Sequence, residues 1–247
     1  MSKRSTTMAT NGDAKKPEPT AQTEYDKPVY DKQRLLLSSD TGHFSLIRAM
    51  HLADLITELN GFCGIMSIFA SLRYCLGDPT ALGNLYTALA LLPLGLFFDF
   101  MDGKVARWRQ KSSMMGQELD SLADLISFGV GPAVAAFAIG MRTPLDHLFL
   151  SFFVLCGLTR LARFNVTTTV IPKDASGKAQ YFEGTPIPTT LGLDALMAYW
   201  VTQGWILGSI PGGVWLAGTV LEFHPVVVLF AIHGCMMTSK SIKIPKP

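Results

Sequence analysis

The chain has 247 residues, of which 49% are hydrophobic and only 16% charged, whereas charged residues make up about 25% of an ordinary soluble domain. The first 44 residues hold 13 of the 40 charged side chains, so the rest of the chain is strongly apolar. This distribution argues against a soluble enzyme, a disordered protein and a disulfide scaffold. The net charge of +2 is too small to indicate nucleic-acid binding.

The N-terminal part differs in composition from the rest. Residues 1–42 are rich in Lys, Pro, Thr, Asp and Ser without hydrophobic periodicity, which predicts a disordered cytosolic tail. Residues 43–53 alternate apolar and polar positions at helical spacing, which predicts an amphipathic helix at the membrane interface. Residues 43–247 are expected to form one membrane domain.

The body predicts an all-α polytopic membrane protein, because apolar runs near the ~20 residues that span a bilayer recur along it. About six transmembrane helices are expected, at 55–76, 81–100, 116–140, 145–162, 189–207 and 224–237, with a polar loop at 164–188. Residues 208–223 give no clear pattern. Basic residues gather in the N-terminal tail, at 104–111, at 160–178 and in the C-terminal tail, which predicts that both termini are cytosolic.

Two pairs of aspartates indicate a divalent-cation site. Asp99 and Asp102 lie three residues apart near the end of one expected helix, and Asp120 and Asp124 lie four apart on the next, so each pair shares a helical face. Four inward-facing carboxylates repel one another in an apolar setting unless one or two cations neutralise them. Oxygen ligands favour Mg²⁺, Mn²⁺ or Ca²⁺.

The residues after the first pair indicate a phosphate-bearing ligand. Gly103 and Ala106 remove side-chain bulk beside the carboxylates, which leaves room for a flat or bulky group against the helix. Arg107 adds a guanidinium fork suited to phosphate.

The complete pattern over residues 99–124 is D-x-x-D-G-x-x-A-R-x8-G-x3-D-x3-D, and it resembles the signature of the CDP-alcohol phosphatidyltransferases. Residues 57–64 are similar to the T-x-x-N-x-x-x-G element of that family. Within the family, residues 115–128, 156–167 and 181–184 and the C-terminal tail resemble the fungal phosphatidylserine synthases.

The resemblance implies the CDP-alcohol phosphatidyltransferase fold and a set of site residues. Two Mg²⁺ or Mn²⁺ ions are expected, and their ligands would be Asp99, Asp102, Asp120 and Asp124. Asp124 would also accept the proton in catalysis. CDP-diacylglycerol would be bound by Thr57, Asn60, Gly103, Ala106, Arg107, Ser113 and Gly116.

The resemblance also indicates the acceptor. Arg160 and Arg163 lie three residues apart, and an arginine binds a carboxylate such as that of an amino acid in a forked geometry. L-Serine would be bound by Arg160, Arg163, Phe164 and Asn165, and its hydroxyl would attack the lipid-bearing phosphorus directly, releasing CMP. The resemblance further implies a homodimer in the endoplasmic reticulum membrane, with membrane lipids and no nucleic acid as partners.

Two alternatives remain open from the residues alone. The acceptor could be inositol or glycerol 3-phosphate, since the motif does not name the alcohol. A cation transporter could use the same intramembrane carboxylates. The transporter hypothesis does not account for Gly103, Ala106, Arg107 or the eight-residue spacing that follows.

Overall fold

The computed structural model describes residues 50, 52–109, 114–170 and 181–245. The expected tail and nearly all of the expected amphipathic helix lie outside these residues. The described elements, in chain order, are α3 (Leu52–Leu76), α4 (Gly83–Arg109), α5 (Met114–Asp124), the π-helical turn η1 (Leu125–Val130), α6 (Gly131–Ile139), α7 (Pro144–Val170), β1 (Tyr181–Glu183), the 3₁₀ turn η2 (Ile187–Thr190), α8 (Leu191–Thr202), the 3₁₀ turns η3 (Leu207–Ser209) and η4 (Pro225–Val227), α9 (Val228–Thr238) and β2 (Lys243–Pro245).

The all-α membrane architecture is confirmed, with one small β pair added. Within the described residues, four helical segments are long and apolar enough to cross a bilayer, at Leu52–Leu76, Gly83–Val105, Met115–Ile139 and Pro144–Val166. The two remaining expected spans are helical but shorter. α8 has 12 residues, and the apolar helix that ends the bundle covers Pro225–Thr238. Twelve α-helical residues rise only ~18 Å, against a hydrocarbon core of ~30 Å.

The third span is continuous but not uniform. α5 passes directly into η1, where the N–H of Gly131 bonds to the carbonyl of Ile126, five residues back, and α6 follows. Such single π turns often occur inside α-helices at functional sites. Here the turn begins immediately after Asp124, the last aspartate of the motif.

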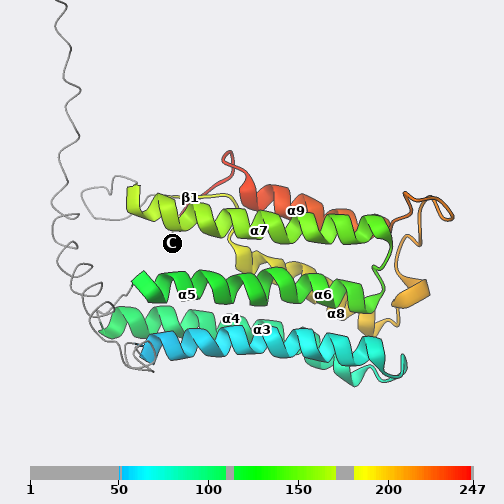
Figure 1. Cartoon of the computed structure of the whole chain (residues 1–247), viewed down its shortest axis with the longest axis horizontal. Coiled ribbons are helices and arrows are strands. Elements are labelled where there is room, and N and C mark those ends of the chain that lie inside the picture. The colour runs from blue at the N-terminus through cyan, green and yellow to red at the C-terminus, as the bar shows by residue number, and fades with distance from the viewer. Residues whose placement is uncertain (1–49, 51, 110–113, 171–180, 246–247) are drawn as a thin grey trace, which may run out of the picture. The chain divides into compact units, whose positions relative to one another are not determined.

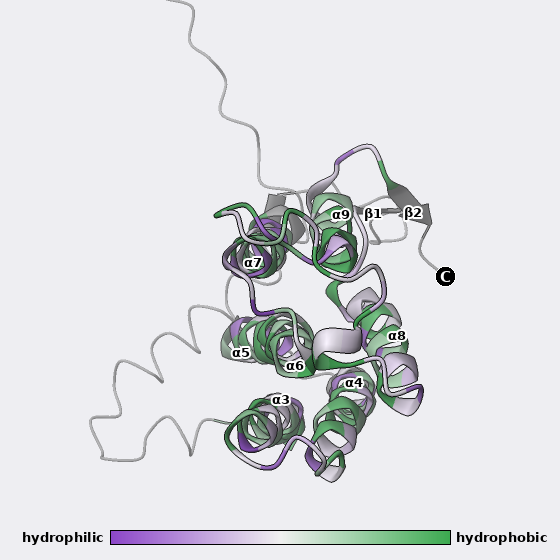
Figure 2. Ribbon diagram, turned by 90° about the vertical axis from the view of Figure 1, so that its right-hand side faces the viewer, coloured by the Kyte–Doolittle hydropathy of each residue, from purple (hydrophilic) through white to green (hydrophobic). Residues whose placement is uncertain are grey.

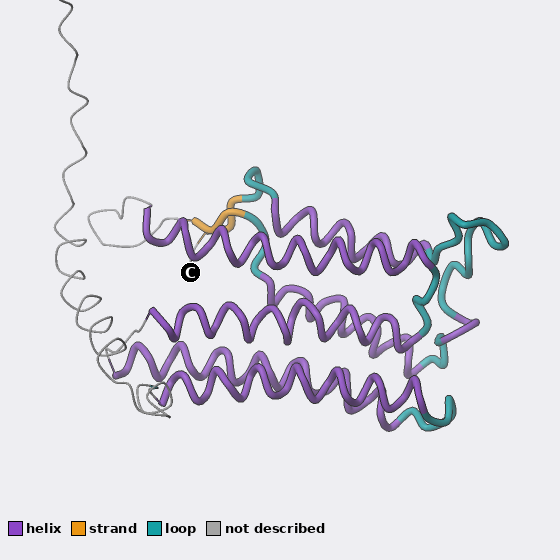
Figure 3. The backbone as a smooth tube through the Cα atoms, viewed as in Figure 1, coloured by secondary structure: helices purple, strands orange, loops and turns teal. Residues whose placement is uncertain are grey.

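The helices lie side by side, so that the chain turns at two opposite ends (Figures 1 and 3). α3 and α5 begin, and α4 and α7 end, at the end drawn on the left of Figure 1. The connections that follow α3, α6 and α8 lie at the other end (Figure 3). The aspartate motif lies near the first end, together with Lys104 and Arg163, whereas the described basic residues of the other end are Arg73 and Arg142. The orientation expected from the sequence, with both termini cytosolic, remains a prediction.

Much of the bundle's outer surface is apolar, as the surface of a bilayer protein must be. Figure 2 shows hydrophobic residues on outward as well as inward faces of the helices. On α3, for example, Leu55, Phe62 and Phe69 are each about half-exposed. In water such a surface would drive aggregation, but against lipid tails it has no such cost.

Residues 164–188 were expected to form a polar loop, and the first part of that prediction is wrong. α7 continues to Val170, so Phe164 and Asn165 lie on a helix. Residues 171–180 lie outside the described part of the chain. Beyond them, β1 pairs antiparallel with β2 from the C-terminal tail, Phe182 opposite Ile244. A three-residue strand has too little alternation to be recognised from its sequence.

Two contacts tie α7 to the α9 segment, one near each of its ends. At one end, Asp146 accepts hydrogen bonds from the backbone N–H of His224 at 2.9 Å and lies 2.6 Å from its ring Nδ1. Near the other end, Arg163 donates to the carbonyl oxygen of Thr238 at 3.0 Å. α7 is thereby positioned along its length, which places its inner face next to α5.

Small residues let α3 approach its neighbours closely. A Cβ on Gly64 would lie 2.6 Å from Ser127 Oγ and 2.8 Å from Ser127 Cα, so no larger residue fits without moving the backbone of η1. A Cβ on Gly95 of α4 would lie 2.9 Å from Asn60 Oδ1. Helices in membranes associate through such close packing, because burial of apolar surface gives no driving force there.

This packing predicts that Gly64→Ala destabilises the bundle by ~1–3 kcal/mol, the usual cost of overpacking. Thermal unfolding of the purified protein in detergent measures the effect. Gly83→Ala is the matched control, because a Cβ there meets no atom within 4 Å and the midpoint should not fall. Equal midpoints for the two variants would contradict the tight α3–η1 contact.

Candidate active site

Three of the four motif aspartates converge between two helices. Asp99 comes from α4, and Asp120 and Asp124 come from α5. One carboxylate oxygen of each lies within 4.8 Å of the others. The sequence predicted that the two pairs face each other, and the structure brings these three together.

Asp102 lies outside this group. Its carboxylate accepts a hydrogen bond from the hydroxyl of Thr57 on α3, and its side chain is buried. Asp102 lies three residues after Asp99 on the same side of α4, and its carboxylate is held by this bond to α3. Its expected role as a metal ligand remains a prediction.

Asn60 of α3 closes the site from a third side. Its amide nitrogen donates to Asp124 at 3.1 Å, and its backbone carbonyl accepts from the Ser127 hydroxyl at 2.8 Å. Its side-chain oxygen Oδ1 is buried without a hydrogen-bond partner, and so is Oδ1 of Asp120. Buried oxygens are normally satisfied, so these orphaned acceptors indicate a missing donor or cation.

The donor set suits the metal ions that the family resemblance implies. The converging atoms are hard carboxylate oxygens at several positions, and no cysteine or histidine belongs to the group. Such oxygens are the ligands preferred by Mg²⁺ and Mn²⁺. Asp99, Asp120 and Asp124 are therefore the described residues that would hold a divalent ion, and they fit one.

A cavity of about 300 Å³ opens directly beside the carboxylates. It is lined by residues of α5 and α7: Gln117, Asp120, Ser121, Asp124, Arg160, Leu161, Phe164 and Asn165. Three of the four residues expected to bind the acceptor therefore share one cavity with two of the expected metal ligands.

Arg160 is the cation of this cavity. Its side chain is only 9% exposed, and its guanidinium carbon lies 5.6 Å from the centre of the Phe164 ring. The aromatic face favours the charge and restricts the orientation of the planar guanidinium. A buried guanidinium turned into a cavity is a strong site for a carboxylate or phosphate.

Arg163 does not share this position. Its guanidinium donates to the carbonyl of Thr238 at the end of α9, and it is absent from the cavity lining. Arg160 and Arg163 lie three residues apart on α7 and so start from the same side of the helix, but the Arg163 side chain reaches to Thr238 at the end of α9. The role expected for Arg163 in binding the acceptor remains a prediction.

The sequence did not lead us to expect that Ser121 and Glu118 contact Asn165. The Ser121 hydroxyl donates to Asn165 Oδ1 at 3.1 Å, and Asn165 Nδ2 donates to Glu118 at 3.2 Å. The available signal was helical spacing, since Gln117, Ser121 and Asp124 repeat at intervals of four and three residues.

The structure describes some, but not all, of the residues expected to bind the nucleotide. A Cβ on Gly103 would meet no atom within 4 Å, so there is open space beside α4 at the predicted place. Thr57 and Asn60 are buried on α3, and Gly116 lies in the first turn of α5. Ser113 and the side chains of Ala106 and Arg107 lie outside the described part of the chain.

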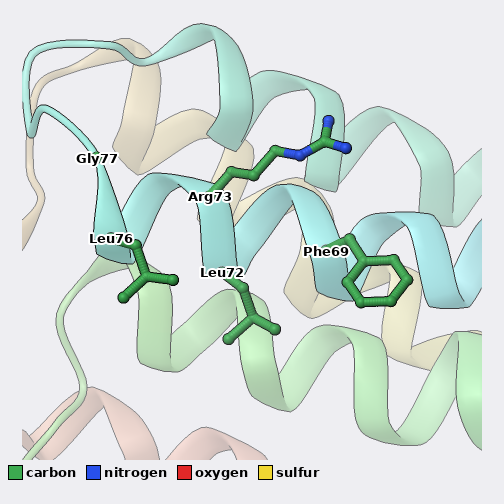
Figure 4. Close-up of a pocket in the computed structure, with 5 residues that line it drawn as sticks. All are labelled: Phe69, Leu72, Arg73, Leu76 and Gly77. Atoms are coloured by element: carbon green, nitrogen blue, oxygen red, sulfur yellow. The ribbon is translucent and has the colours of Figure 1, made fainter.

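A larger hollow at the far end of α3 is not a comparable site. It has a volume of about 570 Å³ and is lined by Phe69, Leu72, Arg73, Leu76 and Gly77. Figure 4 shows its apolar side chains on one side of α3 and the Arg73 guanidinium directed away from them. A single basic group among exposed apolar residues is suited to lipid rather than to chemistry on a polar substrate.

Comparison with known proteins identifies the family. The profile described as CDP-alcohol phosphatidyltransferase matches residues 50–231, which is most of the chain. The chain belongs to this family, as its aspartate motif indicated.

Three relatives indicate the branch of the family. CDP-diacylglycerol–serine O-phosphatidyltransferase of Saccharomyces cerevisiae is 58% identical over 212 residues, which cover 85% of this chain and 76% of the relative. The Bacillus subtilis protein of the same name is 34% identical over 136 residues, covering 54% of this chain and 67% of the relative. An archaetidylserine synthase of Methanothermobacter thermautotrophicus is 36% identical over 140 residues, covering 56% and 53%.

Proposed function

We propose that this chain is a membrane-embedded transferase that makes phosphatidylserine from CDP-diacylglycerol and L-serine, with release of CMP. The single observation that carries the proposal is the cavity in which the buried Arg160 faces the motif carboxylates. The names of the relatives give the same substrates.

The donor and the metal would share one end of the site. Asp99, Asp120 and Asp124 would hold the divalent ions, Mg²⁺ or Mn²⁺, with Asp102 as an additional ligand. Bound ions supply neutralisation of the diphosphate and of the charge on departing CMP. Gly103 and Ala106 would lie against the cytidine, Arg107, Ser113 and Gly116 near the diphosphate, and Thr57 and Asn60 would border the nucleotide from α3.

The acceptor would occupy the cavity. Its carboxylate would bind the guanidinium of Arg160, beside Phe164 and Asn165, which directs the hydroxyl toward Asp124. The hydroxyl oxygen forms a bond to the phosphorus that carries diacylglycerol, and the bond from that phosphorus to the CMP oxygen breaks. Asp124 takes the hydroxyl proton as general base, so no covalent intermediate on the enzyme is required.

The alternatives have less support. Inositol carries no anion for Arg160, whereas glycerol 3-phosphate does and is therefore the stronger competitor as acceptor. A cation transporter does not agree with the family to which the chain belongs.

The enzyme would have one catalytic membrane domain, formed by residues 43–247, and a cytosolic tail, residues 1–42. The basic end of the bundle would face the cytosol, following the positive-inside rule, and so would both termini. The enzyme would act as a homodimer in the endoplasmic reticulum membrane.

An acceptor panel tests the proposed function directly. Purified full-length protein with CDP-diacylglycerol and Mg²⁺ or Mn²⁺ should release CMP with L-serine and not with inositol or glycerol 3-phosphate. Asp124→Asn should lower kcat at least 10³-fold while CDP-diacylglycerol still binds, because it removes the proton acceptor. CMP release driven by another alcohol, or normal turnover by this variant, would contradict the proposal.

Substitutions of Arg160 and of Arg163 should have different effects on the KM for serine. Arg160→Gln should raise the KM for serine about tenfold or more, because a charge-assisted contact is lost, and change the KM for CDP-diacylglycerol little. Arg163→Gln is the matched control and should raise the serine KM less, because Arg163 contacts Thr238. Equal effects of both variants, or equal effects on both substrates, would argue against a carboxylate site at Arg160.

A further inference from the structure

Asn60 of α3 is attached to the α5–η1 segment at two points. Its side-chain amide donates to Asp124 Oδ1 at 3.1 Å, and its backbone carbonyl accepts from the Ser127 hydroxyl at 2.8 Å. Asp124 ends α5, and Ser127 lies three residues later in η1. Asn60 and Ser127 have no exposed surface and Asp124 has little, so both bonds are shielded from solvent.

Gly64 explains how the Ser127 hydroxyl reaches a carbonyl inside a helix. In an α-helix the carbonyl of one residue accepts from the N–H four residues later, and its second lone pair can accept another bond. Gly64 is the residue four after Asn60, and a Cβ on it would lie 2.6 Å from Ser127 Oγ. A side chain there would take the place of the hydroxyl, so the glycine leaves the Asn60 carbonyl open to η1.

The amide of Asn60 meets Asp124 in one orientation. An ionised carboxylate accepts hydrogen bonds and donates none, so the NH₂ group of the amide must face Asp124 and its oxygen must face away. That oxygen lies against α4, where a Cβ on Gly95 would be 2.9 Å from it. The amide is thus enclosed between α4 and α5, and its position depends on where the backbone of Asn60 is held.

We propose that Ser127 is a positioning residue for the divalent-ion site. Its hydroxyl fixes the backbone of Asn60, and the Asn60 amide then holds one oxygen of Asp124, which sets the direction in which this carboxylate meets the ion. The inference rests on the proposed function through the metal role of Asp124, and it adds a residue that lies outside the aspartate motif. Ser127 contacts neither the ion nor a substrate in this proposal, and its effect passes entirely through Asn60.

Ser67 of α3 provides a matched control. Ser67 and Ser127 are both fully buried, and each donates to a backbone carbonyl of a neighbouring helix at 2.8 Å, Ser67 to Ala88 of α4. Ser67 lies about two helical turns beyond Asn60. The variants Ser67→Ala and Ser127→Ala therefore remove the same kind of bond, and only the second bond is connected to the carboxylates.

The first measurement is Mn²⁺ binding to the purified full-length protein in detergent, followed by the electron paramagnetic resonance of free Mn²⁺. Ser127→Ala should raise the dissociation constant of Mn²⁺ about fivefold to tenfold, because Asp124 loses its fixed orientation. It should lower kcat with L-serine by a similar factor and change the serine KM by less than about twofold. Ser67→Ala should lower the thermal unfolding midpoint as much as Ser127→Ala does, but leave Mn²⁺ binding, kcat and KM unchanged.

A double-mutant cycle tests whether Ser127 acts through Asn60. Asn60→Ala removes the amide that donates to Asp124 and should itself weaken Mn²⁺ binding. Once the amide is absent, the position of this backbone no longer affects the carboxylate. Adding Ser127→Ala to Asn60→Ala should therefore weaken Mn²⁺ binding no further, although each variant alone does so.

The inference is wrong if Ser127→Ala binds Mn²⁺ as tightly as the wild-type protein, or if Ser67→Ala weakens binding equally, because the bond would then only stabilise the bundle. It is also wrong if the effects of Ser127→Ala and Asn60→Ala add. A wild-type protein that binds no Mn²⁺ would overturn the metal role of Asp124 and the inference with it. If the wild-type protein binds Mn²⁺ but does not use L-serine, the proposed function alone fails, because Mn²⁺ binding still decides the role of Ser127.

Discussion

The close contact of α3 with α5 and η1 is the constraint on which the site depends. Gly64 leaves no room for a side chain against Ser127, and the Ser127 hydroxyl bonds to the backbone of Asn60. Asn60 in turn donates to Asp124. Three carboxylates within 4.8 Å of one another repel, so their helices must be held together by packing and by a neutralising ligand. This contact therefore holds Asp124 in place from the α3 side.

The cavity combines two kinds of chemistry in a small volume. Its inner side carries Asp120 and Asp124, which fit a hard divalent ion, and its α7 side carries Arg160, with Asn165 nearby. α7 is held to the α9 segment near both ends, by Asp146 with His224 and by Arg163 with Thr238. In the proposed site, Arg163 would thus help to position the helix that carries Arg160. In the proposed reaction, a substrate reaching from Arg160 toward Asp124 would be oriented for attack by this framework.

Sequence patterns predicted the parts of the molecule that depend on local periodicity. Long apolar runs predicted α3, α4, the α5–α6 span and α7. Aspartates at helical spacing predicted the carboxylate cluster. The patterns failed where tertiary contacts decide the outcome. The polar residues after Arg163 suggested a loop, yet α7 continues to Val170, and its Asn165 bonds to Ser121 and Glu118 of α5. The turning of Asp102 toward Thr57, the β1–β2 pair and the Glu118–Asn165 contact all join residues far apart in sequence.

The proposed site requires that carboxylates from α4 and α5 jointly hold a divalent ion beside the cavity. Crystals of the protein grown with CDP-diacylglycerol and Mn²⁺ would locate the ion by its anomalous scattering. An anomalous peak should appear in contact with Asp99, Asp120 and Asp124, and it should be lost in crystals of Asp120→Asn. A peak bound elsewhere, or a peak that persists unchanged in that variant, would contradict it.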